Sequence, residues 1–591
     1  MDSISGLNPQ QKAAVENING AMLILAGAGS GKTKVLTCRI AHLLELGVPP
    51  YKILAITFTN KAAKEMRSRV DAMVGSAAKD VWLYTFHAFC ARFLRSEIEI
   101  SGKYKSNFAI YDAADQKNLI KAILKDMNLD EKRFPPAALQ NAISNAKNEM
   151  LDAAAFAKLA GDFFEQKAAE VYEQYEKRLA VNNALDFDDL LMVTVKILTE
   201  YPEIREKYQK RFNYIMIDEY QDTNRTQYLL ACYLAGDTGN LCAVGDADQS
   251  IYGWRGADIR NILDFEKDYP GARLLKLEQN YRSTVKILDA ANAVIENNTG
   301  RKPKKLWTEN PEGAVLTYYN ATDERDEARF VVEQAQALLR NKNYRYGDMA
   351  VLYRTNTQSR VFEEILIKSG ISYNMVGGIK FYDRKEIRDV MAYLKLLYNP
   401  YDTLSLLRII NVPKRGIGAA TIGKLQDYAN AKGLSLFEVI TNASSVPGLS
   451  ARFVSKLEEM SSVLFDLMGD ASELLVEELI ENVTQKTGYL EELELERTPQ
   501  AESRIENLQE LISVAQDFLK EEGEKTLAQF LEHVALVSDI DDAQLDNDKI
   551  TLMTLHSAKG LEFPVVFLAG MEEGLFPHAR SLMDEEALEE E

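Results

Sequence analysis

The sequence has few cysteines, and none of them forms a recognisable pair. Only four occur among 591 residues, Cys38, Cys90, Cys232 and Cys242. They lack the short spacing of a zinc site, and they lie among apolar neighbours. We therefore expect buried free thiols in a reducing compartment, which argues against a disulfide framework.

Long apolar runs are also missing. No run approaches the roughly 20 residues that cross a bilayer, and residues 1–20 are too polar for a secretory signal. We therefore expect no membrane partner. The chain is too long for one hydrophobic core, so several domains are expected. Its 46% apolar and 27% charged residues are ordinary for a globular protein.

An excess of basic residues is absent as well. Lys and Arg number 69 against 89 Asp and Glu, which gives a net charge of −20. This balance argues against a general nucleic-acid coat. It leaves room for a local basic track, because charges are screened beyond about 8 Å at physiological salt.

The most informative stretch is residues 21–33, AMLILAGAGSGKT. An apolar strand at 21–25 is followed by a turn of small residues, and residues from Lys34 have helical apolar spacing. Strand, glycine loop and helix together aim backbone N–H groups at one anion. Lys32 would then reach the β- and γ-phosphates, and the Thr33 hydroxyl would ligate Mg²⁺. The residues predicted to form this loop are Ala26, Gly27, Ala28, Gly29, Ser30 and Gly31.

This loop departs from the usual pattern G-x-x-x-x-G-K-[ST] at one position, because Ala26 stands where the first glycine is expected. Alanine is acceptable there if the residue only ends the strand. The alternative is a glycine-rich turn with no ligand. The strand–turn–helix context favours a nucleoside triphosphate site.

Two carboxylates follow a later apolar strand. Residues 214–217 lead into Asp218 and Glu219. Asp218 at the strand tip would hold Mg²⁺, and Glu219 would orient and deprotonate the water that attacks the γ-phosphate. An acidic turn at the end of a parallel strand is the alternative. Gln249, after a further strand at 241–244, is suited to sensing the γ-phosphate or its water.

An aromatic loop follows Gln249. Tyr252, Trp254 and Arg255 occur together in the sequence YGWRG. Exposed aromatic residues beside arginine suit base stacking, at roughly 1–3 kcal/mol per base. A lone tryptophan is more often a core residue, but glycines on both sides of this segment favour contact with a ligand.

Strands and helices alternate along much of the chain, which predicts an α/β fold with parallel sheets. Further strands are expected at 53–59, 81–85, 349–353, 550–555 and 564–569. Ligands of such sheets bind at the carboxyl ends of the strands, where Phe58, Asn60 and His87 would lie. Asn60 is the expected N-cap of the helix that follows it.

Two long stretches lack this alternation. Residues 104–188 and 381–544 are predicted to be helical insertions. Within the second, residues 410–418 resemble the turn of a helix–hairpin–helix, where backbone N–H groups would bind a duplex phosphate; a plain loop is the alternative. A basic cluster at 301–305 is expected to be solvated surface.

Eight ordered motifs carry a specific resemblance. They are LNPQQ (7–11), AGAGSGKT (26–33), AITFTNKAAKEM (55–66), TFHAF (85–89), IDEYQDTN (217–224), VGDADQSIYGWRGA (244–257), LEQNYRS (277–283) and TLHSAKGLEF (554–563). The chain resembles the UvrD/Rep/PcrA family of superfamily 1 DNA helicases, and most of all its PcrA branch. The resemblance implies two RecA-like P-loop motor domains, each with a mostly helical insertion. The implied boundaries are 1–103 and 189–276 for the first motor, 104–188 for its insertion, 277–380 and 545–591 for the second motor, and 381–544 for its insertion.

The resemblance also implies roles for individual residues. At the ATP site, Gln11 would read adenine, Arg39 and Tyr281 would flank the base, and Glu562 would bind the ribose. Lys32 and Arg282 would bind phosphate, Thr33 and Asp218 would bind Mg²⁺, Glu219 would be the catalytic base and Gln249 the sensor. Residues implied in base pockets are Phe58, Tyr252 and Trp254. Those implied to line the DNA strand or to couple the two sites are Asn60, His87, Arg255, Arg354, Asn356 and His556.

The family resemblance predicts an ATP-dependent 3′–5′ DNA helicase, stimulated by DNA, in the bacterial cytosol and associated with the nucleoid. Its expected partners are single-stranded DNA, junctions of single- and double-stranded DNA, and repair or replication proteins. Family members continue past the acidic stretch at 584–591 into a motif with a second phosphate-contacting arginine, and this sequence stops before it. The alternative is therefore an ATP- and DNA-binding fragment with little motor activity. A third reading, a non-motor enzyme such as a kinase, fits the aromatic loop and Arg282 poorly.

Overall fold

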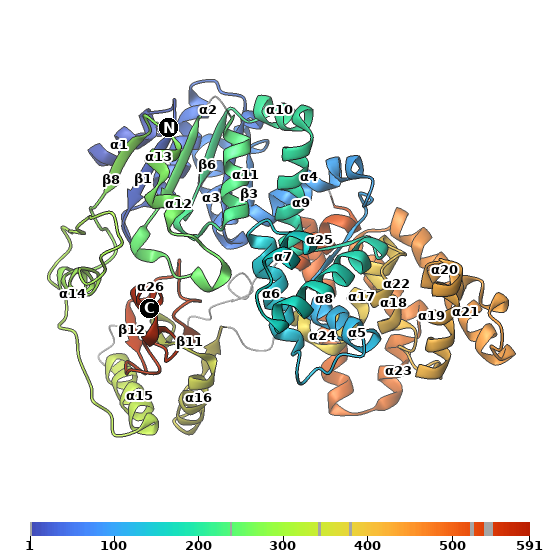
Figure 1. The fold of residues 1–591 in the computed structure, drawn as a ribbon. Coiled ribbons are helices and arrows are strands. Elements are labelled where there is room, and N and C mark those ends of the chain that lie inside the picture. The colour runs from blue at the N-terminus through green and yellow to red at the C-terminus, as the bar shows by residue number, and fades with distance from the viewer. Residues whose placement is uncertain (1–2, 237–238, 341–343, 377–380, 521–524, 537–547) are drawn as a thin grey trace. The chain divides into compact units, whose positions relative to one another are not determined.

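The computed structural model describes most of the chain. The described residues are 3–236, 239–340, 344–376, 381–520, 525–536 and 548–591. Their contacts divide the chain into two compact units (Figure 1). Unit 1 comprises Met1–Phe86, Leu198–Gly378 and Val537–Glu591, and unit 2 comprises His87–Ile197 and Ile379–Leu536.

Unit 1 contains a six-stranded sheet in which every strand pair is parallel, in the order β3-β2-β6-β7-β1-β8. Its strands are β1 (Met22–Ala26), β2 (Ile53–Thr57), β3 (Trp82–Thr85), β6 (Tyr214–Ile217), β7 (Leu241–Gly245) and β8 (Arg273–Leu277). The central strands are short apolar runs buried on both faces, as expected of a parallel sheet covered by helices. The predicted α/β class is confirmed.

Helices cover this sheet (Figure 1). The longer ones are α1 (Pro9–Glu16), α2 (Lys32–Glu45), α3 (Asn60–Val74), α10 (Pro202–Arg211) and α11 (Arg225–Ala235), and two short ones are α12 (Arg260–Leu263) and α13 (Phe265–Asp268). The predicted apolar face of α2 is buried: Val35, Leu36 and Ile40 share a core with Met22 and Ile24 of β1. Its helical spacing therefore packs α2 directly onto the central strand.

The start of α3 corrects one prediction. The strand β2 ends at Thr57, and Thr59 is the N-cap, with its side chain accepting a hydrogen bond from the Ala62 N–H at 3.1 Å. Asn60 is the first residue of the helix and not its cap. Threonine and asparagine side chains can both cap a helix. Because Thr59 and Asn60 are adjacent, the sequence alone located the start of the helix only to within one residue.

A second parallel sheet lies in unit 1, with the strand order β10-β11-β9-β12. Its strands are β9 (Met349–Tyr353), β10 (Tyr373–Met375), β11 (Ile550–Thr554) and β12 (Val565–Leu568). The helices of this region are α14 (Val285–Ile295), α15 (Glu324–Arg340), α16 (Ser359–Lys368) and α26 (Glu585–Glu590). The core pairs α15 residues such as Val331 and Val332 with Val351 of β9 and Leu552 of β11. The strands predicted at 349–353, 550–555 and 564–569 therefore belong to a sheet of their own.

Unit 2 combines the two stretches that were predicted as helical insertions. Its helices include α5 (Ala113–Asp126), α6 (Pro136–Asn148), α7 (Ala153–Leu159), α8 (Phe163–Val181), α17 (Lys385–Tyr398), α18 (Thr403–Ile409), α19 (Ala419–Lys432), α20 (Leu436–Thr441), α21 (Ala451–Glu473), α22 (Val476–Lys486), α23 (Tyr489–Glu496), α24 (Pro499–Lys520) and α25 (Leu527–Leu536). Two further helices, α4 (Phe86–Glu97) and α9 (Phe187–Glu200), cross the division between the units.

The first of these stretches is not wholly helical. Two short parallel strands, β4 (Ala109–Tyr111) and β5 (Ala184–Asp186), pair with each other. Each has only three residues, too few for a periodic sequence signal. Asp186 also caps α9, since its carboxylate accepts the Asp189 N–H at 2.8 Å.

Polar contacts join the two stretches within unit 2. The Asn399 Nδ2 donates to the carbonyl oxygens of Asn182 and Asn183 at 2.9 and 3.1 Å, and the Tyr111 hydroxyl donates to Asp402 at 2.7 Å. Segments more than 200 residues apart in sequence therefore form one body. The predicted boundaries of the two motors and their insertions remain predictions. Two of them, at 380/381 and 544/545, involve residues that lie outside the described part of the chain.

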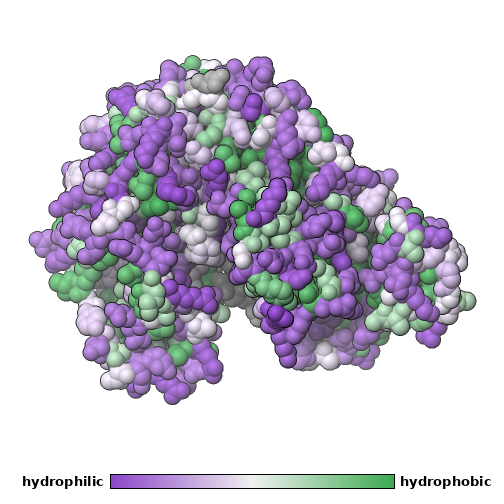
Figure 2. Space-filling view, viewed as in Figure 1, coloured by the Kyte–Doolittle hydropathy of each residue, from purple (hydrophilic) through white to green (hydrophobic). Residues whose placement is uncertain are grey.

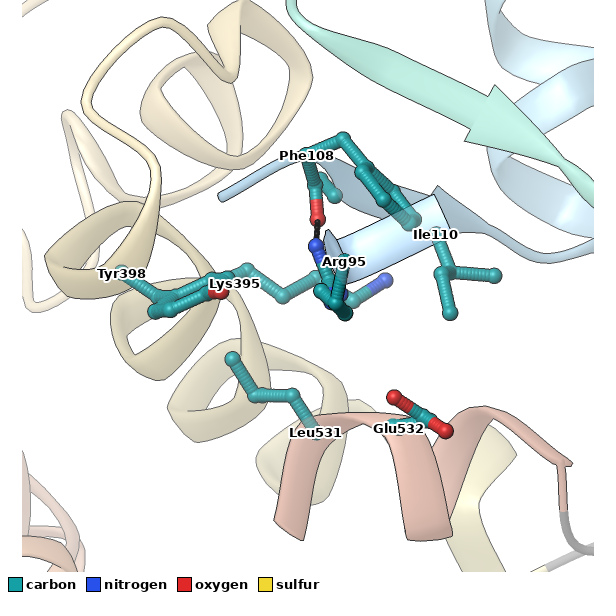
Figure 3. Close-up of a pocket in the computed structure, with 8 residues that line it drawn as sticks. Arg95, Phe108, Ile110, Lys395, Tyr398, Leu531 and Glu532 are labelled. Atoms are coloured by element: carbon teal, nitrogen blue, oxygen red, sulfur yellow. Dashed lines mark hydrogen bonds between the residues drawn. The ribbon is translucent and has the colours of Figure 1, made fainter. Parts of the chain in front are cut away.

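A small cavity lies where α4, β4, α17 and α25 meet in unit 2 (Figure 3). The guanidinium of Arg95 donates to the carbonyl oxygens of Ser106 and Phe108, both at 2.7 Å, and lies over the Phe108 ring. Its Nε is buried without a hydrogen-bond partner. Glu532 of α25 also lines this cavity, and burial raises its pKa to about 7 although Arg95 and Arg92 oppose the shift.

The surface and the thiols agree with the sequence. Hydrophilic residues cover most of the face shown in Figure 2. Within the described ranges, no helix has both the length and the apolar character needed to traverse a bilayer. All four cysteines are free; three are buried and Cys232 is half-buried, close to the prediction of buried thiols.

Candidate functional site

The glycine loop has the predicted geometry. Ala26 ends β1, which explains why alanine is accepted at this position, and α2 begins at Lys32. Gly29 and Gly31 have φ values of 63° and 86°, a left-handed conformation that favours glycine. Gly31 caps α2 without a side-chain bond, so the first N–H groups of the helix face the loop.

Residues from far along the chain cover this loop. Asn280 donates from Nδ2 to the Ala28 carbonyl at 2.7 Å, and the Tyr281 N–H donates to the Gly29 carbonyl at 2.9 Å. A Cβ added at Gly27 would lie 2.1 Å from the Leu306 side chain. The absence of a side chain at position 27 therefore lets Leu306 approach the loop closely.

Lys32, Glu219 and Gln249 meet next to the loop. The Lys32 Nζ lies 3.0 Å from the Glu219 carboxylate and 3.4 Å from the Gln249 Oε1. Burial opposes the charge on Glu219, but Lys32 and Lys559, with a hydrogen bond from Gln221, lower its pKa to about 2. Glu219 also has φ of 50°, a strained conformation for a residue with a side chain.

Asp218 has the environment of a cation ligand. Its side chain is buried at the end of β6, and burial followed by the charge of Glu219 raises its pKa to about 7. Its Oδ1 accepts the Glu219 N–H at 3.0 Å. A divalent cation would favour the ionised form, so Asp218, with Thr33 in the first turn of α2, fits the oxygen donors that Mg²⁺ prefers. Among the described residues, no cluster of three or more Asp, Glu, His or Cys side chains is arranged to hold a metal ion.

Two neighbours complete this polar cluster. The Gln221 Nε2 donates to Glu219 at 2.6 Å, while its Oε1 accepts the Asp246 N–H at 2.9 Å. The Asp246 carboxylate accepts from the Gln249 Nε2 at 2.5 Å. Sequence reasoning named neither Gln221 nor Asp246, although both stand inside the motifs IDEYQDTN and VGDADQ.

The residues predicted around the base are arranged in different ways. Gln11 is buried and its amide donates to the Ser30 carbonyl at 2.9 Å, while it also accepts the Asn8 N–H in a capping box of α1. Arg39 is buried too, and its Nη1 donates to the carbonyl oxygens of Ala14 and Asn17. Tyr281 is exposed, and its hydroxyl accepts from the Asn8 Nδ2 at 2.9 Å. Their predicted contacts with adenine remain predictions.

Arg282 and Glu562 contact each other. The Arg282 Nε lies 2.6 Å from the Glu562 carboxylate, and both side chains remain largely exposed. One was predicted to bind phosphate and the other ribose, so the structure brings together two residues assigned to one ligand. Asn280 orients this segment, since its Oδ1 accepts the N–H groups of Arg282 and Ser283.

The aromatic loop forms a cluster with the second sheet region. The rings of Tyr252, Trp254 and His556 have centroids 6.1–6.5 Å apart, and the Arg255 guanidinium lies 4.5 Å from the Trp254 ring centre. Trp254 is 60% exposed, so it is a surface residue and not part of the core. The Lys559 Nζ donates to the Gln249 carbonyl at 2.7 Å, pairs with Asp222, and lies 5.1 Å from the Tyr252 ring.

The other residues predicted to line DNA are less closely grouped. Phe58 packs edge-on against Phe86 at 5.4 Å, and Asn60 opens α3. Arg354 pairs in a bidentate manner with Glu591 at 2.5–3.1 Å, and Asn356 begins the short helical turn Asn356–Gln358. His87 falls in unit 2, where its ring lies 5.6 Å from Phe187.

Comparison with protein families decides the relationship. A model of the UvrD/REP helicase N-terminal domain matches residues 7–270, and a model of the UvrD-like helicase C-terminal domain matches residues 275–591. This chain belongs to the UvrD/REP helicase family. The resemblance seen in the motifs is thereby confirmed.

Curated relatives of this helicase family cover nearly all of the chain. The ATP-dependent DNA helicase PcrA of Bacillus subtilis (strain 168) is 52% identical, over 100% of this chain and 80% of the relative. The protein of the same name from Staphylococcus aureus (strain Mu50) is 50% identical, over 99% of this chain and 80% of the relative. That of Staphylococcus epidermidis is also 50% identical, over 100% of this chain and 81% of the relative.

Within this UvrD-like framework, sequence reasoning missed residues that act between motifs. Lys559 contacts Gln249 and Asp222 and so joins the second sheet region to the candidate catalytic residues. The motif HSAKG contains it, but nothing in the sequence shows which side chains a lysine will meet. The assigned roles of the individual site residues remain proposals.

Proposed function

We propose that this chain is an ATP-dependent DNA helicase that moves 3′ to 5′ on single-stranded DNA, in DNA repair or replication. One observation carries the proposal: a single loop connects the candidate catalytic cluster to the exposed aromatic cluster. Gln249 faces Lys32 at one end, and Trp254, separated from it only by residues 250–253, faces His556 and Arg255 at the other. A displacement of the loop at the catalytic cluster would therefore also displace the aromatic cluster. The bacterial relatives, named as ATP-dependent DNA helicases, support the same activity.

The ATP site would work through an exchange of ion pairs. Lys32 would bind the β- and γ-phosphates and thereby leave Glu219, whose low pKa depends on that lysine. Freed from the pair, Glu219 becomes a better base for the attacking water. Bound Mg²⁺, with Thr33 and Asp218 as its protein ligands, would neutralise phosphate charge. Gln249 and Arg282 would contact the γ-phosphate, while Gln11, Arg39, Tyr281 and Glu562 would hold the nucleoside.

The DNA strand would lie along the aromatic cluster. Tyr252, Trp254 and Phe58 would stack on bases, and Arg255 and Arg354 would contact the strand. His556, with Asn60, His87 and Asn356, would line the track or link it to the ATP site. Arg354 is held by Glu591 in the structure, so binding would require exchange of that carboxylate for phosphate or base.

A duplex contact is proposed for the turn between α18 and α19. The Asn411 side chain accepts the N–H groups of Arg415 and Ile417, which shapes the turn, and Gly416 has φ of 74°. Lys414 is 84% exposed at its side chain. An exposed lysine beside a helix start would bind a phosphate of duplex DNA. Together with the single strand at the aromatic cluster, this contact would favour junctions of single- and double-stranded DNA as substrates.

Two assays test the proposal. ATP hydrolysis is measured with and without single-stranded DNA, and strand displacement is compared on duplexes with a 3′ or a 5′ tail. We expect DNA-stimulated hydrolysis and displacement from the 3′-tailed duplex. Hydrolysis without displacement would favour the fragment alternative. Hydrolysis indifferent to DNA would favour a non-motor enzyme.

Localisation in the nucleoid and recruitment by repair or replication proteins complete the proposal.

A further inference from the structure

The basic cluster at 301–305 is only in part the solvated surface that the sequence predicted, because Lys305 is exposed but Arg301 and Lys304 are not. Lys304 has a side chain only 3% exposed, and it forms ion pairs with both Asp246 and Asp248. Arg301 forms two hydrogen bonds with Asp248, both at 2.8 Å, and donates to the Lys304 carbonyl at 3.2 Å. Two cations and two carboxylates therefore form a nearly buried, neutral cluster.

The segment that carries Lys304 is fixed to the glycine loop. Its neighbour Leu306 contacts Gly27, and the Trp307 backbone pairs with Glu278 and Asn280. Asn280 in turn donates to the Ala28 carbonyl at 2.7 Å. Lys304 is therefore held in a constant position relative to the phosphate-binding loop.

Asp246 transmits this position to Gln249. Its Oδ1 pairs with Lys304 and accepts the Asp248 N–H at 3.0 Å, while its Oδ2 accepts from the Gln249 Nε2 at 2.5 Å. The Oε1 of the same Gln249 amide lies 3.4 Å from the Lys32 Nζ. The amide thus has one orientation, with its nitrogen toward Asp246 and its oxygen toward Lys32.

We propose that Lys304 is a positioning residue of the ATP site, which neutralises Asp246 and thereby orients Gln249 toward the γ-phosphate. This inference rests on the proposed function. Without Lys304, the buried Asp246 carboxylate would be left with Lys32 as a nearby cation, and Lys32 already interacts with the charges of Glu219, Asp246 and Asp218. Lys32 would then be drawn toward Asp246 and away from phosphate.

Substitutions around Lys304 separate positioning from general stability. Lys304→Met removes the charge and keeps much of the side-chain volume. Lys302→Met is the matched control, because Lys302 pairs with Glu266 at 2.9 Å outside the cluster. Asp246→Asn removes the charge of the group that accepts the hydrogen bond from Gln249, but it leaves Lys304 paired with Asp248. It therefore tests the orientation of Gln249 in a protein that keeps an ion pair at Lys304.

The test measures kcat and KM for ATP hydrolysis in the presence of single-stranded DNA. DNA affinity in the absence of nucleotide and the melting temperature are measured as well. We expect Lys304→Met and Asp246→Asn to lower kcat by about 10–100-fold, the cost of a misplaced catalytic group, with less change in KM. DNA affinity should stay within about twofold, and Lys304→Arg should recover most of the lost kcat. Lys302→Met should behave as the parental protein.

Three results would overturn the positioning role. The first is a parental kcat in Asp246→Asn, which also decides the case if Lys304→Met does not fold. The second is an equal loss of kcat and DNA affinity in Lys304→Met, because a smaller fraction of folded protein would lower both quantities together. The third is the same loss of kcat in Lys302→Met. If the parental chain itself shows no DNA-stimulated hydrolysis, the proposed function fails and this inference fails with it.

Discussion

The Lys32 ammonium lies 3.0 Å from the Glu219 carboxylate, although 187 residues separate the two in sequence. Their strands are brought together by β7, which lies between β1 and β6 in the sheet. The pair is screened little, because both side chains are mostly buried. In the proposed function, an incoming phosphate would compete with Glu219 for this lysine, so that nucleotide binding would also free the proposed catalytic base.

The first prediction separates binding from hydrolysis. Lys32→Ala should weaken ATP binding, because it removes the cation expected to contact the phosphates. Glu219→Gln keeps the shape of the side chain and removes the base, so binding should be retained or improved while hydrolysis falls by orders of magnitude. Titration with a fluorescent ATP analogue and a steady-state ATPase assay measure the two effects. Hydrolysis by Glu219→Gln at the parental rate would show that another group activates the water.

The second prediction concerns the exposed indole. Trp254→Ala should weaken single-stranded DNA binding by roughly 1–3 kcal/mol, the value of one stacked base. Its high exposure means that little packing is lost, so the melting temperature should change by a few degrees at most. The control is Tyr318→Ala, an 84% exposed aromatic residue outside the cluster, which should leave DNA affinity unchanged. A large fall in melting temperature with parental DNA affinity would remove Trp254 from the site.

The third prediction concerns salt. The net charge is −20, and Arg354 and Lys559 near the aromatic cluster are already paired with carboxylates. DNA binding should therefore displace few counterions, and stacking should carry much of the affinity. For single strands each phosphate contact contributes about −0.7 to the slope of log K against log salt, so we expect a slope shallower than about −3. A slope near −7, equivalent to about ten contacts, would contradict this expectation.

The fourth prediction concerns pH and Glu532. Burial raises the pKa of this carboxyl from its ordinary value of 4.5 to about 7 in the folded state. The folded state therefore binds the proton more tightly than the unfolded state, and the stability of unit 2 should fall as pH rises from about 4.5 to about 7. Glu532→Gln should remove this part of the pH dependence and raise the melting temperature above pH 7.

Calorimetric melts of the parental protein and the variant between pH 5 and 8, a range chosen around the shifted pKa, measure this effect. Glu510→Gln, at an exposed position of α24, is the control and should leave the pH dependence of melting intact. A variant that melts lower than the parental protein at pH 8 would mean that the charged carboxylate supports Arg95, contrary to this prediction.

Local features of the sequence determined most of the strands and the glycine loop, but not the strands β4, β5, β8 and β10. The bounds predicted for residues 214–217 and 349–353 are those of β6 and β9, because each is a short apolar run between polar turns. The order of the motifs was enough to place the chain in its family, and it put Lys32, Glu219 and Gln249 in one site before any contact was known.

Tertiary structure alone decided which partners the polar side chains meet. Lys304 reads in sequence as one of several surface cations, yet packing of its segment against Gly27 buries it between two carboxylates. Asn399 likewise joins two stretches that look independent along the chain. The physical reason is that hydrogen bonds and ion pairs act over a few ångströms in space, whereas a sequence pattern reports only neighbours along one strand or one helix face.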